Sequence, residues 1–150
     1  MSCLTNFNIH NFREIRPSLT TGAALLFLHT MIFSHFEYCI TSWSYASAEA
    51  LKPIKSLFKR ALKALDRKPL TYHYCKILPK YSLLSFENFV SFKTACLTYK
   101  ILHGLAPPPL EEFIKLNTTR VTRATTRGDC AIPHRSNTFA QNSLSVKGSH

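Results

Sequence analysis

The sequence predicts an all-α fold: a small bundle of about three main helices, a short fourth helix and an irregular basic tail. Apolar residues recur every three to four positions in long segments, no segment alternates strongly enough to build a sheet, and residues that cap or break helices separate the segments. With 150 residues, 45% of them hydrophobic, the chain can bury one modest core. We expect an irregular lead-in at residues 1–11, a helical domain at 12–116 and a tail rich in Arg, Ser and Thr at 117–150.

The first predicted helix opens at Pro17 and Ser18, because proline suits the first turn of a helix. Its apolar positions recur at helical spacing and are Leu19, Ala23, Leu26, Phe27, Thr30 and Phe33. Leu25, Leu28 and Ile32 fall on other faces, and a helix that is apolar nearly all round should lie inside a protein. The aromatic residues of this region are expected in a core rather than as platforms for stacked bases: Phe27, Phe33, Phe36, Tyr38 and Trp43.

The second predicted helix is capped by Ser47 and runs to about Arg67, and Pro53 should kink it or shift its start. Its apolar stripe consists of Leu51, Ile54, Phe58, Leu62 and Leu65. A row of basic side chains runs beside this stripe and consists of Lys52, Lys55, Lys59 and Lys63, joined by Arg60. This row is the best candidate for contact with phosphate groups, because each neutralised phosphate releases counterions. The alternative is an ordinary solvated face.

Shorter segments surround the third main helix. Residues 72–78 predict a short helical turn or an irregular link that Pro79 stops. Ser85 is expected to cap the third main helix, and Gly104 is expected to end it, because glycine readily adopts the left-handed conformation found after many helices. A short amphipathic helix is predicted at 110–116.

The charge balance is strongly basic, with 19 Lys and Arg against 8 Asp and Glu and a formal net charge of +11. A surface of this kind favours polyanions, meaning nucleic acid or anionic lipid, although basic residues can also serve only to keep an apolar fragment soluble. In the tail, Arg120, Arg123 and Arg127 complete the candidate nucleic-acid-binding residues. A membrane partner is the least favoured, because the apolar run at 22–36 is shorter than the roughly 20 residues of a spanning helix.

Catalysis is not expected from this chain. Two-metal phosphoryl transfer needs clustered carboxylates, yet the two aspartates, Asp66 and Asp129, are far apart in the sequence, and the four glycines form no phosphate-binding loop. His73 and Cys75 could form half of a zinc site, but structural zinc sites normally show two tight ligand pairs. We expect no enzyme, no cofactor and no metal site.

Five widely spaced cysteines favour an intracellular protein, in the nucleus or the cytoplasm. They form no Cys-x-x-Cys pair, and their odd number does not suggest a disulfide framework. The cysteines are Cys3, Cys39, Cys75, Cys96 and Cys130.

Several blocks of sequence are distinctive as patterns, although the chemistry of their residues alone does not indicate a function. They occur in one order as 31–43, 51–53, 65–69, 72–73 and 99–108, followed in the tail by 122–130 and 145–149. The blocks at 31–43 (Met-Ile-Phe-Ser-His-Phe-Glu-Tyr-Cys-Ile-Thr-Ser-Trp), 65–69 (Leu-Asp-Arg-Lys-Pro) and 99–108 (Tyr-Lys-Ile-Leu-His-Gly-Leu-Ala-Pro-Pro) are the most distinctive. Their order strongly resembles the region C-terminal to the catalytic palm in reverse transcriptases of LINE-like non-LTR retrotransposons, of the kind abundant in fish genomes.

The resemblance covers nearly the whole chain, roughly residues 12–149. It implies a helical thumb followed by a C-terminal extension, which would help to hold template and primer beside the palm. The Tyr/Phe-Ala-Asp-Asp motif of the palm and the endonuclease domain of such elements are absent from this sequence. We therefore expect a truncated, non-catalytic copy.

Two functions follow as hypotheses. The first is a retrotransposon fragment with at most weak, nonspecific binding to RNA or DNA. The second is a host-adopted protein-interaction module, in which exposed apolar helix faces dock a partner that replaces the palm.

Overall fold

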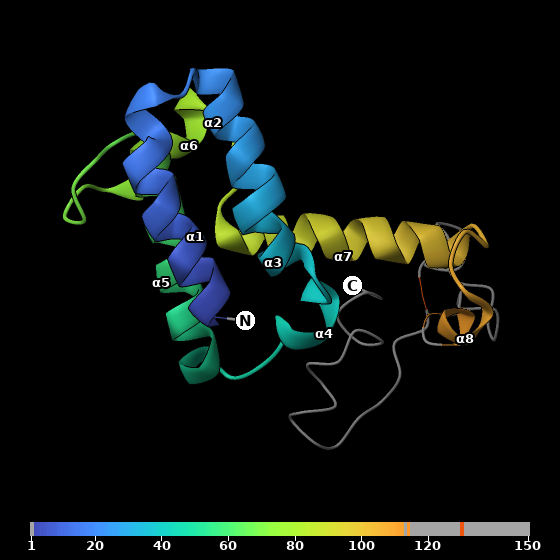
Figure 1. Ribbon diagram of the computed structural model, residues 1–150. Helices are drawn as coiled ribbons and strands as arrows, with labels where there is room; N and C mark the ends of the chain where they lie inside the picture. The colour runs from blue at the N-terminus through green and yellow to red at the C-terminus, as the bar shows by residue number, and fades with distance from the viewer. Residues whose placement is uncertain (1, 113, 115–129, 131–150) are drawn as a thin grey trace. The chain divides into compact units, whose positions relative to one another are not determined.

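The computed structural model describes residues 2–112, 114 and 130, and these residues are mostly helical, with no strand among them (Figure 1). The all-α prediction is therefore confirmed. The chain divides into two compact units. Unit 1 consists of Met1–Ile40 and Ser47–Phe89, and unit 2 consists of Thr41–Ala46 and Val90–His150.

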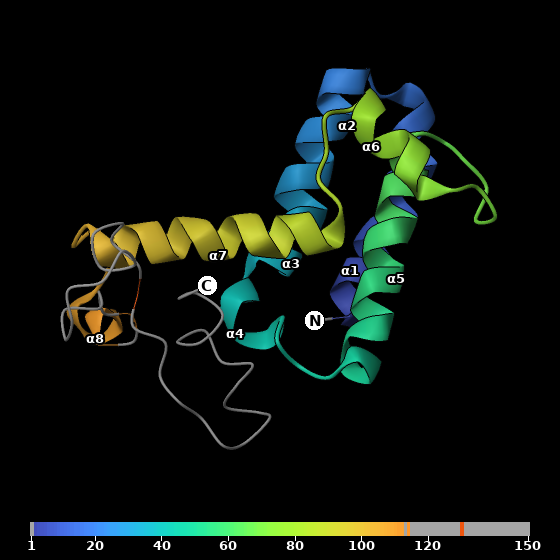
Figure 2. The ribbon, with the colours of Figure 1, turned by 180° about the vertical axis from the view of Figure 1, so that it is seen from behind.

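Unit 1 begins with helix α1 (Ser2–Ile15), which lies along helix α5 (Ala48–Leu65) (Figures 1 and 2). The predicted irregular lead-in at 1–11 is therefore wrong. Thr5, Ile9 and Phe12 fall on one face of α1 and are almost completely buried. This narrow stripe is the physical reason for the error, because packing of one face can stabilise a polar, Asn-rich helix that shows little helical pattern in its sequence.

The next helix is built in three consecutive pieces: α2 (Thr21–Phe27), a π-helical turn η2 (Leu28–Phe33) and α3 (Ser34–Glu37). Pro17 lies instead in a separate 3-10 turn, η1 (Arg16–Ser18). Thr20 is the actual cap, and its side chain accepts a hydrogen bond from the backbone N–H of Ala23 at 3.3 Å. The helix therefore begins slightly later than predicted.

The buried face of this helix also differs from the prediction. Ala24, Leu28, Ile32 and Phe36 are buried, whereas Leu26 is 66% exposed. In a segment that is apolar nearly all round, periodicity does not indicate which face is buried. The packing of η2 against α1 and α5 determines the buried face. A π-turn also shifts the phase of the residues that follow it.

Helix α5 begins where predicted and ends at Leu65, slightly before the predicted end, and of its predicted apolar stripe only Ile54 is not fully buried. Ser47 caps it by accepting a hydrogen bond from the backbone N–H of Ala50 at 3.3 Å. Pro53 lies inside the helix and does not shift its start. The buried residues of α5 are Leu51, Leu57, Phe58, Ala61, Leu62, Ala64 and Leu65.

A short turn η3 (Tyr74–Lys76) and helix α6 (Ile77–Lys80) follow α5 in unit 1. Pro79 was expected to stop this segment, but it lies inside α6, where the helix ends one residue later. Ile77 anchors α6 because its side chain is completely buried.

Five phenylalanine rings fill much of the core of unit 1. Phe58 occupies the centre, with its ring stacked on Phe33 at a centroid distance of 5.0 Å and edge-on to Phe36 and Phe86 at 5.7 and 5.6 Å. Phe89 completes the group at 6.2 Å from Phe58. The predicted core role is confirmed for Phe33 and Phe36, since each is 2% exposed.

The predicted core role is not met equally by the other three aromatic residues of this region, Phe27, Tyr38 and Trp43. Phe27 is partly buried and stacks on Phe12 at 5.1 Å, and Trp43 is also partly buried. Tyr38 is 73% exposed, so its assignment to the core is wrong.

Helix α7 (Phe86–Leu102) has its first turn in unit 1 and the remainder in unit 2. Its predicted ends are confirmed. Ser85 accepts a hydrogen bond from the backbone N–H of Asn88 at 3.2 Å, and Gly104 adopts a φ of +64° just beyond the helix. This left-handed residue allows the N–H of Leu105 to bond the carbonyl of Lys100 at 2.8 Å.

Unit 2 also contains α8 (Pro108–Glu111) and part of α4 (Ile40–Trp43). Helix α8 begins two residues before the predicted 110–116 segment, because proline suits the first turn of a helix; residues 113 and 115–116 lie outside the described part. Tyr45 and Thr94 share a hydroxyl–hydroxyl hydrogen bond of 2.8 Å. Within the described residues, no helix has the length and apolar character needed to cross a membrane.

Candidate nucleic-acid interface

Both units carry a net positive charge in the sequence. Unit 1 carries eleven Lys and Arg against five Asp and Glu, a formal +6, and unit 2 carries eight against three, a formal +5. Six of the basic residues of unit 2, including the predicted Arg120, Arg123 and Arg127, lie outside the described residues. Within the described residues, the excess of positive charge therefore lies on unit 1.

The first half of the predicted lysine row is engaged in ion pairs. The ammonium of Lys52 lies 2.7 Å from Glu49, and that of Lys55 lies 2.9 Å from Glu87. The hydrogen bond from Lys55 lowers the pKa of Glu87 below its ordinary value. Exposed pairs of this kind contribute little stability, typically about 0 to 1 kcal/mol, so a phosphate group can displace the carboxylate at small cost.

The second half of the row is less compensated by carboxylates. The ammonium of Lys59 lies 5.2 Å from the centre of the Tyr74 ring, and that of Lys63 donates a hydrogen bond to the carbonyl of Leu70. The aromatic ring attracts the ammonium electrostatically but carries no net negative charge to neutralise it. Lys59, which is exposed, is therefore the member of the row best placed to meet a phosphate.

Arg60 differs from the lysines because it is partly buried. Its Nε is enclosed and has no hydrogen-bond partner among the described residues. It borders a hollow of about 330 Å³ lined by Cys3, Asn6, Pro53, Ser56, Leu57 and Arg60. The structure thus turns Arg60 toward α1 rather than into the exposed lysine row.

A second basic location, which the sequence did not predict, is a larger hollow of about 710 Å³ in unit 1. It is lined by Arg16, Thr21, Leu25, Asp66, Arg67, Lys68, Lys80, Tyr81 and Ser82. These residues come from the ends of η1, α2, α5 and α6, which converge in this part of unit 1 (Figures 1 and 2). We call it the basic hollow.

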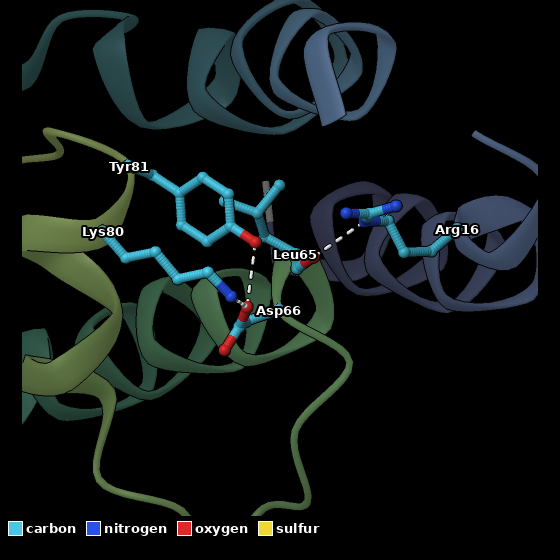
Figure 3. Close-up of polar contacts among 5 residues, drawn as sticks. All are labelled: Arg16, Leu65, Asp66, Lys80 and Tyr81. Atoms are coloured by element: carbon cyan, nitrogen blue, oxygen red, sulfur yellow. Dashed lines mark hydrogen bonds and ion pairs between the residues drawn. The ribbon is translucent and has the colours of Figure 1, made fainter. Parts of the chain in front are cut away.

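Asp66 is the one carboxylate among the residues that line the basic hollow, and Figure 3 shows it beside Lys80 and Tyr81. Lys80 donates to Asp66 through its ammonium, and Tyr81 donates through its hydroxyl at 2.8 Å. Burial alone would raise the pKa of Asp66, but the hydrogen bonds from Lys80 and Tyr81, with the charges of Lys80 and Lys68, lower it below its ordinary value. The bond to Asp66 raises the pKa of Lys80 in turn. Asp66 and Lys80 therefore compensate each other.

Arg16 closes another side of the basic hollow and is only 7% exposed. Its Nε donates to the carbonyl of Leu65 at 2.7 Å (Figure 3). Its Nη1 donates to the carbonyl of Leu19 at 3.0 Å. Because Leu65 is the last residue of α5, Arg16 satisfies a carbonyl at the negative end of that helix dipole.

Arg67 and Ser82 line the same hollow in left-handed backbone conformations, each with a φ of 52°. Arg67 follows the end of α5, where the N–H of Lys68 bonds the carbonyl of Lys63 at 2.9 Å, the pattern of a helix end that usually carries glycine. Ser82 occupies the equivalent place after α6. Left-handed conformations are unfavourable for side-chain-bearing residues and cluster at functional sites.

The structure thus brings the predicted residues Lys52, Lys55, Lys59 and Lys63 together along α5 and adds the basic hollow. The sequence did not reveal the hollow because Arg16, which lines it, is held by a hydrogen bond to Leu65, 49 residues away along the chain. The block at 65–69 was the one available signal, since it contains Asp66, Arg67 and Lys68. Within the described residues, no group of three or more His, Cys, Asp or Glu side chains could hold a metal ion.

Comparison of the chain with known protein families, with curated proteins and with solved structures finds no match. The function must therefore be argued from the distribution of charge and from the chemistry of the site.

Proposed function

We propose that this protein is a non-catalytic nucleic-acid-binding fragment of a retrotransposon-type reverse transcriptase, and that unit 1 contacts the phosphate backbone of RNA or DNA. The observation that carries the proposal is the formal +6 of unit 1, together with the row of lysines along α5 in which Lys59 is exposed. The retrotransposon origin rests on the ordered sequence blocks alone.

The geometry of the lysine row supports weak and nonspecific binding. Lys52 and Lys55 must leave Glu49 and Glu87 to meet a phosphate, and this exchange reduces the net gain. The five phenylalanine rings of the core are buried and therefore cannot stack on bases. Contacts with phosphates carry no sequence information, so affinity should depend on salt and hardly on base sequence.

A direct test measures binding of the full chain to labelled single-stranded and double-stranded oligonucleotides over a range of salt concentrations. We expect binding at about 50 mM salt that weakens steeply toward about 200 mM, with little difference between sequences. Absence of binding at the lower salt concentration would reject the proposal.

A matched pair of lysine variants locates the interface. Lys59→Gln in unit 1 should weaken binding and reduce the slope of log affinity against log salt by about 0.7 to 0.9, the contribution of one phosphate contact. Lys100→Gln removes an equally exposed lysine from unit 2 and should change neither. Equal effects of the two substitutions would contradict an interface on unit 1.

A second candidate function is a protein-interaction module, because the described part of unit 2 exposes large apolar side chains. Phe92 and Tyr99 lie two turns apart on one face of α7 and are 53% and 59% exposed, and Leu105 beyond the helix is 68% exposed. Exposed apolar patches commonly mark interaction sites. This function would be favoured by a protein partner that the Phe92→Ser variant no longer binds and the Lys59→Gln variant still binds. A compact monomer that binds no partner would count against it.

We also infer an intracellular location, in the nucleus or the cytoplasm. Exposed cysteines such as Cys3, Cys39 and Cys75 fit a reducing compartment. Finding the endogenous protein in the secreted fraction of cells would contradict this inference.

A further inference from the structure

The basic hollow carries an excess of positive charge that its own residues do not neutralise. Four cationic side chains line it, Arg16, Arg67, Lys68 and Lys80, against the single carboxylate of Asp66. Asp66 is bonded to Lys80, and among the described residues the other three cations form no ion pair. The negative end of the α5 dipole amounts to roughly half a charge. More than two positive charges therefore remain uncompensated.

Arg16 differs from the other three cations because it is more than nine-tenths buried. Two backbone carbonyls accept hydrogen bonds from it, and its remaining N–H groups have no partner among the described residues. A buried cation is costly unless an anion and further hydrogen bonds compensate it. The guanidinium also presents flat pairs of N–H donors that match the oxygens of a phosphate group.

Arg67 adds a second, independent observation. The position after α5 requires a left-handed conformation that glycine adopts freely, yet arginine occupies it. Ser82 occupies the equivalent position after α6 and faces the same hollow. At both positions glycine would be less strained than the residue present. Arg67 instead supplies a charged side chain and Ser82 a hydroxyl, and both groups can donate hydrogen bonds to phosphate oxygens.

We propose that the basic hollow binds a phosphate monoester, either the terminal phosphate of a nucleic-acid strand or a free mononucleotide. A monoester carries about −1.5 to −2 charges at neutral pH, which suits more than two uncompensated cations better than the single charge of an internal phosphodiester. The volume of about 710 Å³ leaves room beside the phosphate for a sugar or base. The strand-end source rests on the proposed function, whereas the mononucleotide source does not.

The test uses the full chain and a labelled oligothymidylate, with and without a 5′-phosphate. We expect the phosphorylated strand to bind about tenfold more tightly, the effect of one charge-assisted contact. Thymidine 5′-monophosphate should remove this advantage in competition, whereas thymidine should not. Binding of labelled thymidine 5′-monophosphate alone then identifies the mononucleotide source.

Three variants connect the effect to the hollow. Arg67→Gly should abolish the advantage of the phosphorylated strand while the fold stays intact, because glycine suits the left-handed backbone. Asp66→Asn removes the one opposing charge and should increase the advantage. Cys39→Gly relieves another left-handed residue, with φ of 50°, without changing charge or touching the hollow, and should leave the advantage unchanged.

The outcomes separate this inference from the proposed function. Equal binding of the two strands, unaffected by Arg67→Gly, would overturn the phosphate-monoester site while leaving backbone binding by unit 1 in place. Binding of thymidine 5′-monophosphate, lost in Arg67→Gly, with no binding of either strand would support the site and reject the proposed function.

Discussion

The two units of this chain share a helical build but differ in what they show to solvent. Unit 1 buries a cluster of phenylalanine rings and carries a formal +6, whereas the described part of unit 2 is neutral and exposes Phe92 and Tyr99 along α7. Unit 1 thus combines a well-packed interior with an excess of positive charge, and both units expose large apolar side chains, such as Leu26 in unit 1 and Leu105 in unit 2. We therefore expect polyanion binding on unit 1 and propose the exposed face of α7 in unit 2 as one place for a protein contact.

The largest expected effect concerns the difference in packing. Phe58→Ala empties the centre of the ring cluster and should lower the free energy of unfolding by about 3 to 5 kcal/mol, because it removes a large buried side chain and leaves a cavity. Phe92→Ala makes the same chemical change at a half-exposed position and should cost less than about 1 kcal/mol. Urea unfolding of both variants measures the contrast, and similar losses would show that the two positions are equally packed.

A smaller effect concerns Asp66, whose carboxylate is 8% exposed and receives hydrogen bonds from Lys80 and Tyr81. Asp66→Asn should reduce the stability of unit 1 by about 1 to 2 kcal/mol at neutral pH. Because the pKa of Asp66 is lowered in the folded state, its contribution is fully present above the unfolded value, about 3.9, and is lost as the pH falls through the folded value.

Urea unfolding of the parent chain and Asp66→Asn from neutral to strongly acidic pH tests this dependence. The gap in stability should close as the solution becomes acidic. A gap that stays constant with pH would mean that the charge of Asp66 contributes nothing.

The smallest effect has the opposite sign. Arg67→Gly should raise the stability of the chain by up to about 1 kcal/mol, because it relieves a left-handed residue at the end of α5. Cys39→Gly should give a similar gain at a position away from the basic hollow. Thermal unfolding of both variants provides the measurement, and a clear loss of stability in Arg67→Gly alone would assign Arg67 a structural contact in place of a binding role.

The parts of the fold that the sequence predicted well are those with local signals. Ser47 and Ser85 mark the starts of α5 and α7, and Gly104 marks the end of α7, because a cap needs only neighbouring residues. Helix α1 and the buried face of α2 were predicted wrongly, because both depend on packing between segments far apart in the chain.

In the candidate site, too, the features with local signals could be predicted and those that depend on distant segments could not. The lysine row could be predicted because helical periodicity alone aligns Lys52, Lys55, Lys59 and Lys63 on α5. Its pairing with Glu87 could not, since 32 residues separate Lys55 from that carboxylate. The basic hollow forms only where η1, α2, α5 and α6 lie close together, and no local sequence pattern predicts that these elements are neighbours.

The most direct test of the difference between the units is lysine acetylation of the full chain with and without bound oligothymidylate, read out by mass spectrometry. We expect the nucleic acid to protect lysines of unit 1, such as Lys59 and Lys68, and to leave Lys100 of unit 2 as reactive as in the free protein. Protection of Lys100 with unchanged reactivity of Lys59 and Lys68 would contradict an interface on unit 1.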